Sequence, residues 1–98
     1  MKVGKSEYTI MSEFEFLQTE IKDLFVIKPF YVKDDRGVYI KTYEKEIFKE
    51  HGIDVGVQEI CGSISKQGVL RGLHFQTKYA QSKLVRCAYG SIFDVSVD

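Results

Sequence analysis

Apolar and polar residues alternate in several short stretches of this 98-residue chain, with the two-residue period of a half-buried strand. Turn-forming residues separate these stretches at intervals of about ten residues. The pattern predicts strands over residues 13–21, 24–30, 38–42, 55–60, 68–76, 82–88 and 92–98. Seven or so short strands at this spacing favour an all-β sandwich or barrel of jelly-roll type.

Two local signals refine this pattern. Pro29 has no backbone N–H for a ladder, so it makes the end of the second strand an edge or a bend. Residues 44–51 are good helix formers and Gly52 stands where a helix would stop, so one or two helical turns are expected there. His51 then reads best as a residue at the helix C-terminus, where the dipole favours it.

Composition limits the chain to one domain. A sequence of 98 residues with 44% hydrophobic content can bury one modest core. We expect residues 1–11 to form a loose N-terminal extension and residues 12–98 to belong to a single β domain. Fourteen Lys and Arg balance fourteen Asp and Glu, so no basic field of the kind that gathers nucleic acid is expected.

Cysteine usage and the N-terminus bear on the compartment. Cys61 and Cys87 lack metal-type spacing, and one disulfide between them is possible but not indicated. Neither a signal peptide nor a membrane span is expected, because no apolar run is long enough. A reduced, cytoplasmic protein without membrane association is therefore predicted.

The stretch from Gly68 to Gln76, Gly-Val-Leu-Arg-Gly-Leu-His-Phe-Gln, carries the strongest chemical signal. His74 can take a proton near neutral pH, and the guanidinium of Arg71 can bind phosphate or carboxylate. A regular strand would point these two side chains to opposite faces, but Gly72 between them suggests a bulge. We expect the bulge to bring Arg71 and His74 onto one concave face. The plainer alternative is a core strand with a hydrogen-bonded His and a surface Arg.

Lys83 is a further candidate, since the alternation over residues 82–88 points it the same way as two apolar side chains. Its alternative is a lysine at a strand end that extends its amine to water. Phosphate-loop, dinucleotide-binding and nucleophile-elbow motifs are missing, and two isolated histidines cannot form the histidine cluster of a metal-binding cupin. No metal site is expected.

Four motifs together resemble dTDP-4-dehydrorhamnose 3,5-epimerases. They are Asp34-Asp-Arg-Gly37, the stretch from Gly68 to Gln76, Lys83-Leu-Val-Arg86 and Phe93-Asp-Val-Ser-Val-Asp98. The resemblance implies a cupin jelly roll, a homodimer and a nucleotide-sugar substrate, converted without cofactor or metal from a 4-keto-6-deoxyglucose to its rhamno isomer.

By position, the resemblance gives a role to each candidate residue. His74 matches the proton acceptor, and Lys83 matches the residue near the enolate oxygen. Arg36 and Arg71 match residues that bind the substrate. Gln58 and Glu59 compete for one substrate-contacting position. A base with a nearby cation is the minimum equipment for removing a proton α to a carbonyl.

The resemblance covers about residues 14–98 and corresponds to the N-terminal half of such an enzyme. It places the proton-donating tyrosine and the carboxylate that orients the base beyond Asp98, so we expect a truncated chain that is inactive alone. The alternative is a non-catalytic cupin-like module for sugar-nucleotide binding or dimerisation. The sequence does not specify which nucleotide sugar is bound.

Overall fold

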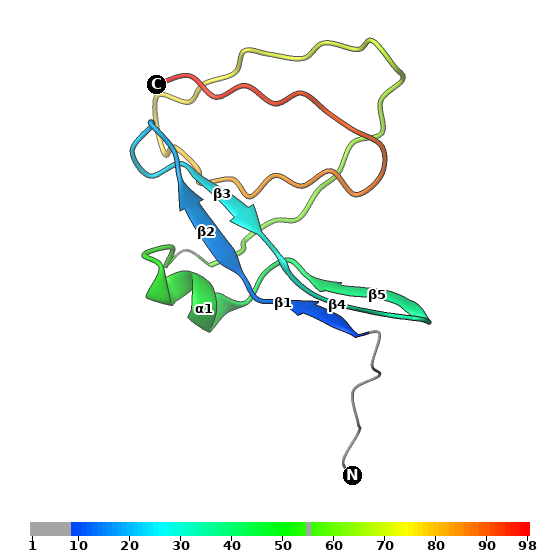
Figure 1. Cartoon of the computed structure of the whole chain (residues 1–98). Helices are drawn as coiled ribbons and strands as arrows, with labels where there is room; N and C mark the ends of the chain where they lie inside the picture. The colour runs from blue at the N-terminus through cyan, green and yellow to red at the C-terminus, as the bar shows by residue number, and fades with distance from the viewer. Residues whose placement is uncertain (1–8, 55) are drawn as a thin grey trace. The chain divides into compact units, whose positions relative to one another are not determined.

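The computed structural model describes residues 9–54 and 56–98 of the chain. Contacts divide it into two units, one within residues 9–54 and one within residues 56–97 (Figure 1). All helices and strands found in the described residues lie in the first unit.

Five short strands of the first unit form two antiparallel sheets. The three-stranded sheet has the order β1-β4-β5, and the two-stranded sheet pairs β2 with β3. The strands are β1 (Ile10–Ser12), β2 (Glu15–Gln18), β3 (Phe25–Lys28), β4 (Phe30–Asp34) and β5 (Gly37–Lys41). Three of them lie within the predicted ranges 13–21, 24–30 and 38–42, allowing for a residue at the strand ends.

Pro29 separates β3 from β4, as its missing N–H would require. The sequence pattern predicted one strand over residues 24–30, whereas the chain bends at Pro29 and continues as β4 to Asp34. Strand β4 is central in its sheet and pairs with β5 in the register Phe30↔Lys41 to Asp34↔Gly37. Asp35 and Arg36 form the two-residue loop of this hairpin, and Gly37 takes a φ of +142°.

Helix α1 (Lys45–Glu50) confirms the helical stretch and its stop signal. Gly52 takes a φ of +82°, and its N–H donates to the carbonyl of Lys49 at 3.0 Å. The N–H of Ile53 donates to the carbonyl of Phe48 at 2.9 Å. These two hydrogen bonds are those of a Schellman motif, in which a glycine with a positive φ ends the helix.

Aromatic side chains form the core of the first unit. Phe48 of α1 is 1% exposed and is the sole fully buried hydrophobic residue among those described. Phe14, Phe16 and Tyr43 surround it with ring centroids 5.6, 5.1 and 4.8 Å away. Tilted and edge-on pairs of this kind contribute about 0.5–1.5 kcal/mol each beyond their buried area.

The second unit corrects the sequence prediction. Residues 56–98 contain no strand, so the strands predicted over residues 55–60, 68–76, 82–88 and 92–98 are wrong for every described residue in those ranges. A strand needs a neighbouring ladder and a surface to pack on, and alternation of side chains alone supplies neither. Every described residue of this unit is exposed, and one backbone–backbone hydrogen bond is found there, from Val69 to Lys66.

The all-β class with one short helix is confirmed, and the described strands close no barrel, in agreement with an incomplete cupin-like jelly roll. Residues 1–8 of the expected extension lie outside the described residues. Ile10 and Met11, placed in that extension from the sequence, belong to β1 and pair with β4, so the extension does not reach Met11. Within the described chain, no helix has the length and apolar character needed to cross a membrane.

Candidate functional site

Arg36 is the predicted site residue with the best-defined geometry. The Oδ1 atom of Asp34 accepts a hydrogen bond from the Arg36 backbone N–H at 2.9 Å. The Oδ2 atom accepts from Nη2 at 2.8 Å and from Nε at 3.2 Å. One carboxylate therefore holds both the backbone and the side chain of Arg36, as short acidic side chains do in tight turns.

Charge and exposure are divided unevenly in this pair. The Asp34 side chain is 17% exposed, whereas that of Arg36 is 87% exposed. Hydrogen bonds from the Arg36 side chain and backbone lower the pKa of Asp34 below its usual 3.8, and Asp34 raises the pKa of Arg36 further above its usual value. Within residues 9–54, Nε and Nη2 donate to Asp34 and Nη1 donates to no protein acceptor, so one edge of the guanidinium faces solvent.

An open hollow of about 290 Å³ lies beside this pair. It is lined by Val32, Asp34, Arg36, Gly37, Val38 and Tyr39. The hollow combines an oriented cation with the exposed ring of Tyr39, a combination suited to an anionic group with a flat apolar neighbour.

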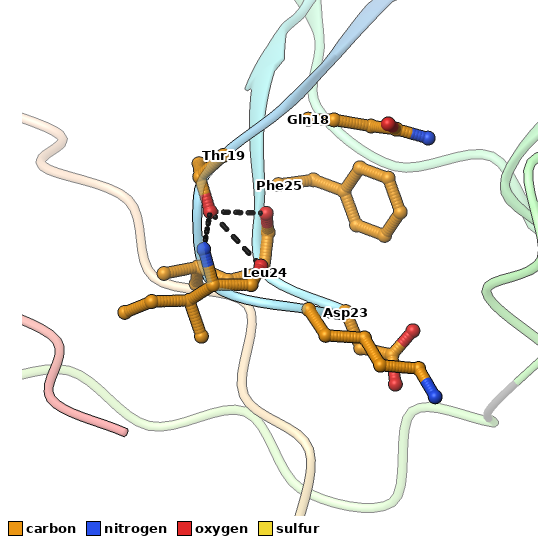
Figure 2. A pocket seen from close by; sticks show the side chains of 7 residues that line it. Gln18, Thr19, Asp23, Leu24 and Phe25 are labelled. Carbon is orange, nitrogen blue, oxygen red and sulfur yellow. Dashed lines mark hydrogen bonds between the residues drawn. The ribbon is translucent and has the colours of Figure 1, made fainter.

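A second hollow, of about 160 Å³, lies at the loop between β2 and β3 (Figure 2). The Thr19 hydroxyl lies 2.8 Å from the Leu24 carbonyl and accepts a hydrogen bond from the Ile21 N–H at 3.2 Å. This hydroxyl is therefore used in closing the loop, and none of the predicted site residues lines the hollow. We assign it no chemical role.

The remaining site residues lie in the second unit and are all exposed. Arg71 donates from Nη2 to the Ser65 hydroxyl at 2.9 Å. Within residues 56–97, no hydrogen bond or ion pair joins His74, Lys83 and Arg71 to one another, so the structure does not bring the base and its cation together. Within residues 56–97, neither the Gln58 nor the Glu59 side chain forms a hydrogen bond, and their competing assignment stays open.

The bulge predicted at Gly72 is absent, because residues 68–76 form no strand in which a bulge could occur. Gly72 takes a φ of +112°, and the His74 ring lies back toward it, with Nδ1 3.7 Å from where a Cβ on Gly72 would be. The expectation that Arg71 and His74 share a concave face is not met in this structure.

Sequence reasoning missed the contact that closes the loop between His74 and Lys83. The side chain of Gln76 accepts a hydrogen bond from the Gln81 backbone N–H at 2.7 Å. Two glutamines five residues apart gave no periodic signal, and an amide that accepts from the backbone across a loop cannot be distinguished from a solvated one in a sequence. Because this contact closes the loop, it limits the distance in space by which His74 and Lys83 can separate.

His51, the second histidine, has a structural environment. Its Nδ1 atom lies 2.9 Å from the Ile47 carbonyl, and its ring stacks on Phe16 with centroids 3.9 Å apart. It is the C-cap residue of α1, as expected from its position before Gly52. His51 therefore holds the end of the helix against the aromatic core.

The family model for dTDP-4-dehydrorhamnose 3,5-epimerase matches residues 18–98, which include every predicted site residue. The chain belongs to this family. The dTDP-4-dehydrorhamnose 3,5-epimerase of Methanothermobacter thermautotrophicus is 44% identical over 88 residues, 90% of this chain and 48% of that protein. The enzyme of the same name from Escherichia coli is 45% identical over 85 residues, 84% of this chain and 45% of that protein.

A third relative, from Pseudomonas aeruginosa, is 43% identical over 79 residues, 80% of this chain and 44% of that protein. The chain thus spans a little less than half the length of these curated relatives. No solved structure matches it.

Proposed function

We propose that this chain carries the N-terminal part of a sugar-nucleotide epimerase. The reaction converts dTDP-4-dehydro-6-deoxyglucose to dTDP-4-dehydrorhamnose by removing protons α to the keto group and returning them on the opposite face. The observation that carries this proposal is the 44% identity over 90% of the chain to a protein named for that activity. The matched family region contains all the proposed site residues.

His74 is the proposed base and Lys83 the proposed cation beside the enolate oxygen. A proton next to a ketone becomes acidic enough to remove only when the charge that develops on oxygen is stabilised. His74 and Lys83 are nine residues apart in sequence, and the Gln76–Gln81 hydrogen bond closes the loop between them. This closed loop supports the proposal that the two residues share one site when the segment is held in place.

Arg36 and Arg71 are the proposed ligands of the anionic nucleotide part. The oriented, exposed guanidinium of Arg36 supports this role, because a fixed fork loses little side-chain entropy when it binds phosphate. Gln58 or Glu59 would contact the sugar. The resemblance implies no cofactor or metal for this chemistry.

The test joins residues 1–98 to the second half of the Methanothermobacter relative. With substrate in heavy water, the joined protein should incorporate deuterium at C3 and C5. His74→Ala should abolish the exchange and leave nucleotide binding within about a few fold, because the base acts in the chemical step. His51→Gln is the matched control and should retain exchange.

Lys83→Met in the same protein should slow turnover, because its loss should raise the activation free energy by about 2–4 kcal/mol. The effect on substrate binding should be smaller. Lys78→Met, in the same loop, should leave turnover unchanged. Deuterium incorporation that persists in His74→Ala would contradict the role of the base. Nucleotide binding with no exchange in the parent protein would favour a non-catalytic binding module instead.

Two further expectations belong to this proposal. The protein would act as a homodimer on a nucleotide sugar, as the resemblance implies. The reaction would take place in the cytoplasm, as the isolated cysteines led us to expect. An absence of nucleic-acid binding also stays a prediction, based on the zero formal charge.

A further inference from the structure

The loop between His74 and Lys83 is closed by a side chain and not by the backbone. The side-chain carbonyl of Gln76 accepts a hydrogen bond from the Gln81 N–H at 2.7 Å, and its amide nitrogen lies 3.5 Å from the Gln81 side-chain carbonyl. Within residues 74–83, no backbone–backbone hydrogen bond is found. Gln76 therefore holds together the two ends of the loop formed by residues 77–80.

The backbone of this loop needs such a closure. Tyr79 takes a φ of +52°, a conformation that residues with a β-carbon rarely adopt. Its side chain is 96% exposed, so packing does not hold it there. A loop of this length can join two antiparallel arms. Within residues 74–83, the Gln76–Gln81 contact is therefore the interaction that keeps the chain turned back on itself.

Counting outward from this contact places His74 opposite Lys83. His74 stands two residues before Gln76, and Lys83 stands two residues after Gln81. In an antiparallel pair of arms that continues from the contact, residues equally far from it face each other. Side chains two residues apart point to the same face of a strand, so the imidazole and the amine would emerge side by side. Directly opposed Cβ atoms are about 4.5–5.5 Å apart.

A neighbouring pair fits the same register. Leu73 and Leu84 are the next residues outward, and they would face each other on the other side of the arms, where apolar pairs stabilise an antiparallel ladder. A shift of the pairing by one residue would instead place Lys83 on the face opposite to His74. The register therefore decides whether base and cation share a face. In the described part of residues 56–98, the arms beyond the contact are not paired.

We propose that Gln76 is a positioning residue, whose bond to the Gln81 N–H sets the register in which His74 and Lys83 face one another when the arms pair. The proposal rests on the proposed function, since it concerns the base and the cation of that reaction. A cation stabilises an enolate only when it is held close to the oxygen that gains charge. A misplacement of about 1 Å in such a site can cost about 100-fold in rate.

Paired cysteines in the 98-residue chain test the register without substrate. The background carries Cys61→Ser and Cys87→Ser, which remove two exposed thiols. His74→Cys together with Lys83→Cys should form an intramolecular disulfide readily, because directly opposed residues have Cα atoms about 4.5–5.5 Å apart, within disulfide range. The quantity measured is the effective concentration of the two thiols in glutathione buffers.

Two comparisons make this test specific. His74→Cys together with Leu84→Cys spans almost the same length of chain out of register, so its effective concentration should be lower. Gln76→Met removes the acceptor and should lower the value for positions 74 and 83 to that of the out-of-register pair. Gln67→Met is the matched control, because Gln67 is exposed and its side chain forms no hydrogen bond within residues 56–97. It should leave the value unchanged.

Kinetics of the joined protein described under the proposed function test the role in the reaction. Gln76→Met should lower kcat by about tenfold or more and change KM by less than about twofold, because Arg36 and Arg71 lie outside the loop. Gln81→Met should lose less activity, since it keeps the backbone N–H to which Gln76 is bonded. Gln67→Met should match the parent.

Equal effective concentrations for the two cysteine pairs would overturn the proposal, and so would a preference that survives Gln76→Met. A Gln76→Met enzyme with a raised KM and the parent kcat would show that Gln76 binds substrate, which would also overturn it. If this enzyme does not fold, the disulfide comparison decides the matter. If the joined parent shows no exchange, the proposed function fails, while the disulfide comparison still decides the register.

Discussion

At the scale of single residues, the acidic turn before β5 orients one cation before any ligand binds. Asp34 is half-buried and accepts hydrogen bonds from the backbone and side chain of Arg36. The guanidinium remains exposed. Among the predicted site residues in the described part of the chain, Arg36 has the most hydrogen bonds holding it, whereas Arg71 has one, to Ser65.

Asp34→Asn should change how stability depends on pH. Arg36 lowers the pKa of Asp34 below 3.8 in the folded state. A carboxyl group with a lowered pKa contributes stability above its unfolded pKa and loses that contribution as pH falls through its folded pKa. The wild-type chain should therefore lose stability below about pH 3.8, and the variant should show less of this acid dependence.

The measurement is the urea midpoint of the first unit between about pH 6 and about pH 2. Asp35→Asn is the matched control, because Asp35 lies in the same turn and its side chain forms no hydrogen bond within residues 9–54. If the two variants follow the same pH profile, the Asp34–Arg36 pair does not contribute to folding.

At the scale of elements, the end of α1 depends on one backbone conformation. Gly52 takes a φ of +82°, which an L side chain adopts at a cost of about 1–2 kcal/mol. A Cβ at Gly52 would meet no atom within 4 Å, so this strain is the whole expected effect. Gly52→Ala should destabilise the first unit by about 1–2 kcal/mol and reduce its helical circular dichroism.

Gly62→Ala is the matched control for this element. Gly62 also has open space around a new Cβ, and it does not adopt a positive φ. Its substitution should change stability by no more than about 0.5 kcal/mol. Equal effects of the two substitutions would show that the helix end does not need the left-handed conformation.

The elements that the sequence predicted correctly depend on neighbours in the chain. β2, β3, β5 and α1 with its glycine stop all form through contacts a few residues apart, and such contacts leave turn and cap signals. Strand β4 was not predicted, because the pattern gave one strand over residues 24–30 where the chain bends at Pro29 and begins a new strand. The three-residue strand β1 was missed because it is too short to show a period and pairs with β4 about twenty residues away. The strands predicted in residues 56–98 carry the correct alternation, yet no partner strand is formed beside them.

The candidate site likewise contains residues positioned by local contacts and residues that need distant contacts. The geometry of Arg36 follows from the turn Asp34-Asp-Arg-Gly37, which is local. Bringing His74 to Lys83 requires two segments to be held side by side by distant contacts. Motif resemblance identified these residues as candidates, but it could not supply the packing that would orient them.

At the scale of the whole chain, the two units differ in how their backbone groups are satisfied. The first unit has five paired strands and a capped helix, whereas residues 56–98 have one backbone–backbone hydrogen bond. Many large apolar side chains of the second unit are exposed, including Phe75 at 86% and Phe93 at 94%. The stability of the chain should therefore be concentrated in the first unit.

Hydrogen exchange can measure this difference directly. Amides of β4, which is paired on both sides, should exchange slowly, and those over residues 56–97 should exchange at nearly the rate of an unstructured peptide. Mass spectrometry of peptic fragments resolves the two. Protection over residues 68–76 or 82–88 equal to that of β4 would show that the strands predicted there form in solution.

The chain of residues 1–98 alone should not catalyse proton exchange on a 4-keto sugar nucleotide. His74 is exposed and has no carboxylate partner within the described residues, so nothing there orients its ring or fixes its tautomer. Lys83 is equally exposed and is not paired with His74, so a developing enolate would be stabilised little better than in water. Arg36 retains its hydrogen bonds to Asp34 in this chain, so weak binding of the nucleotide part should remain.

The assay compares deuterium incorporation at C3 and C5 with a buffer blank, and nucleotide binding is measured by calorimetry on the same sample. Incorporation above the blank that is lost in His74→Ala would show that a solvent-exposed base suffices for at least one of the two proton transfers.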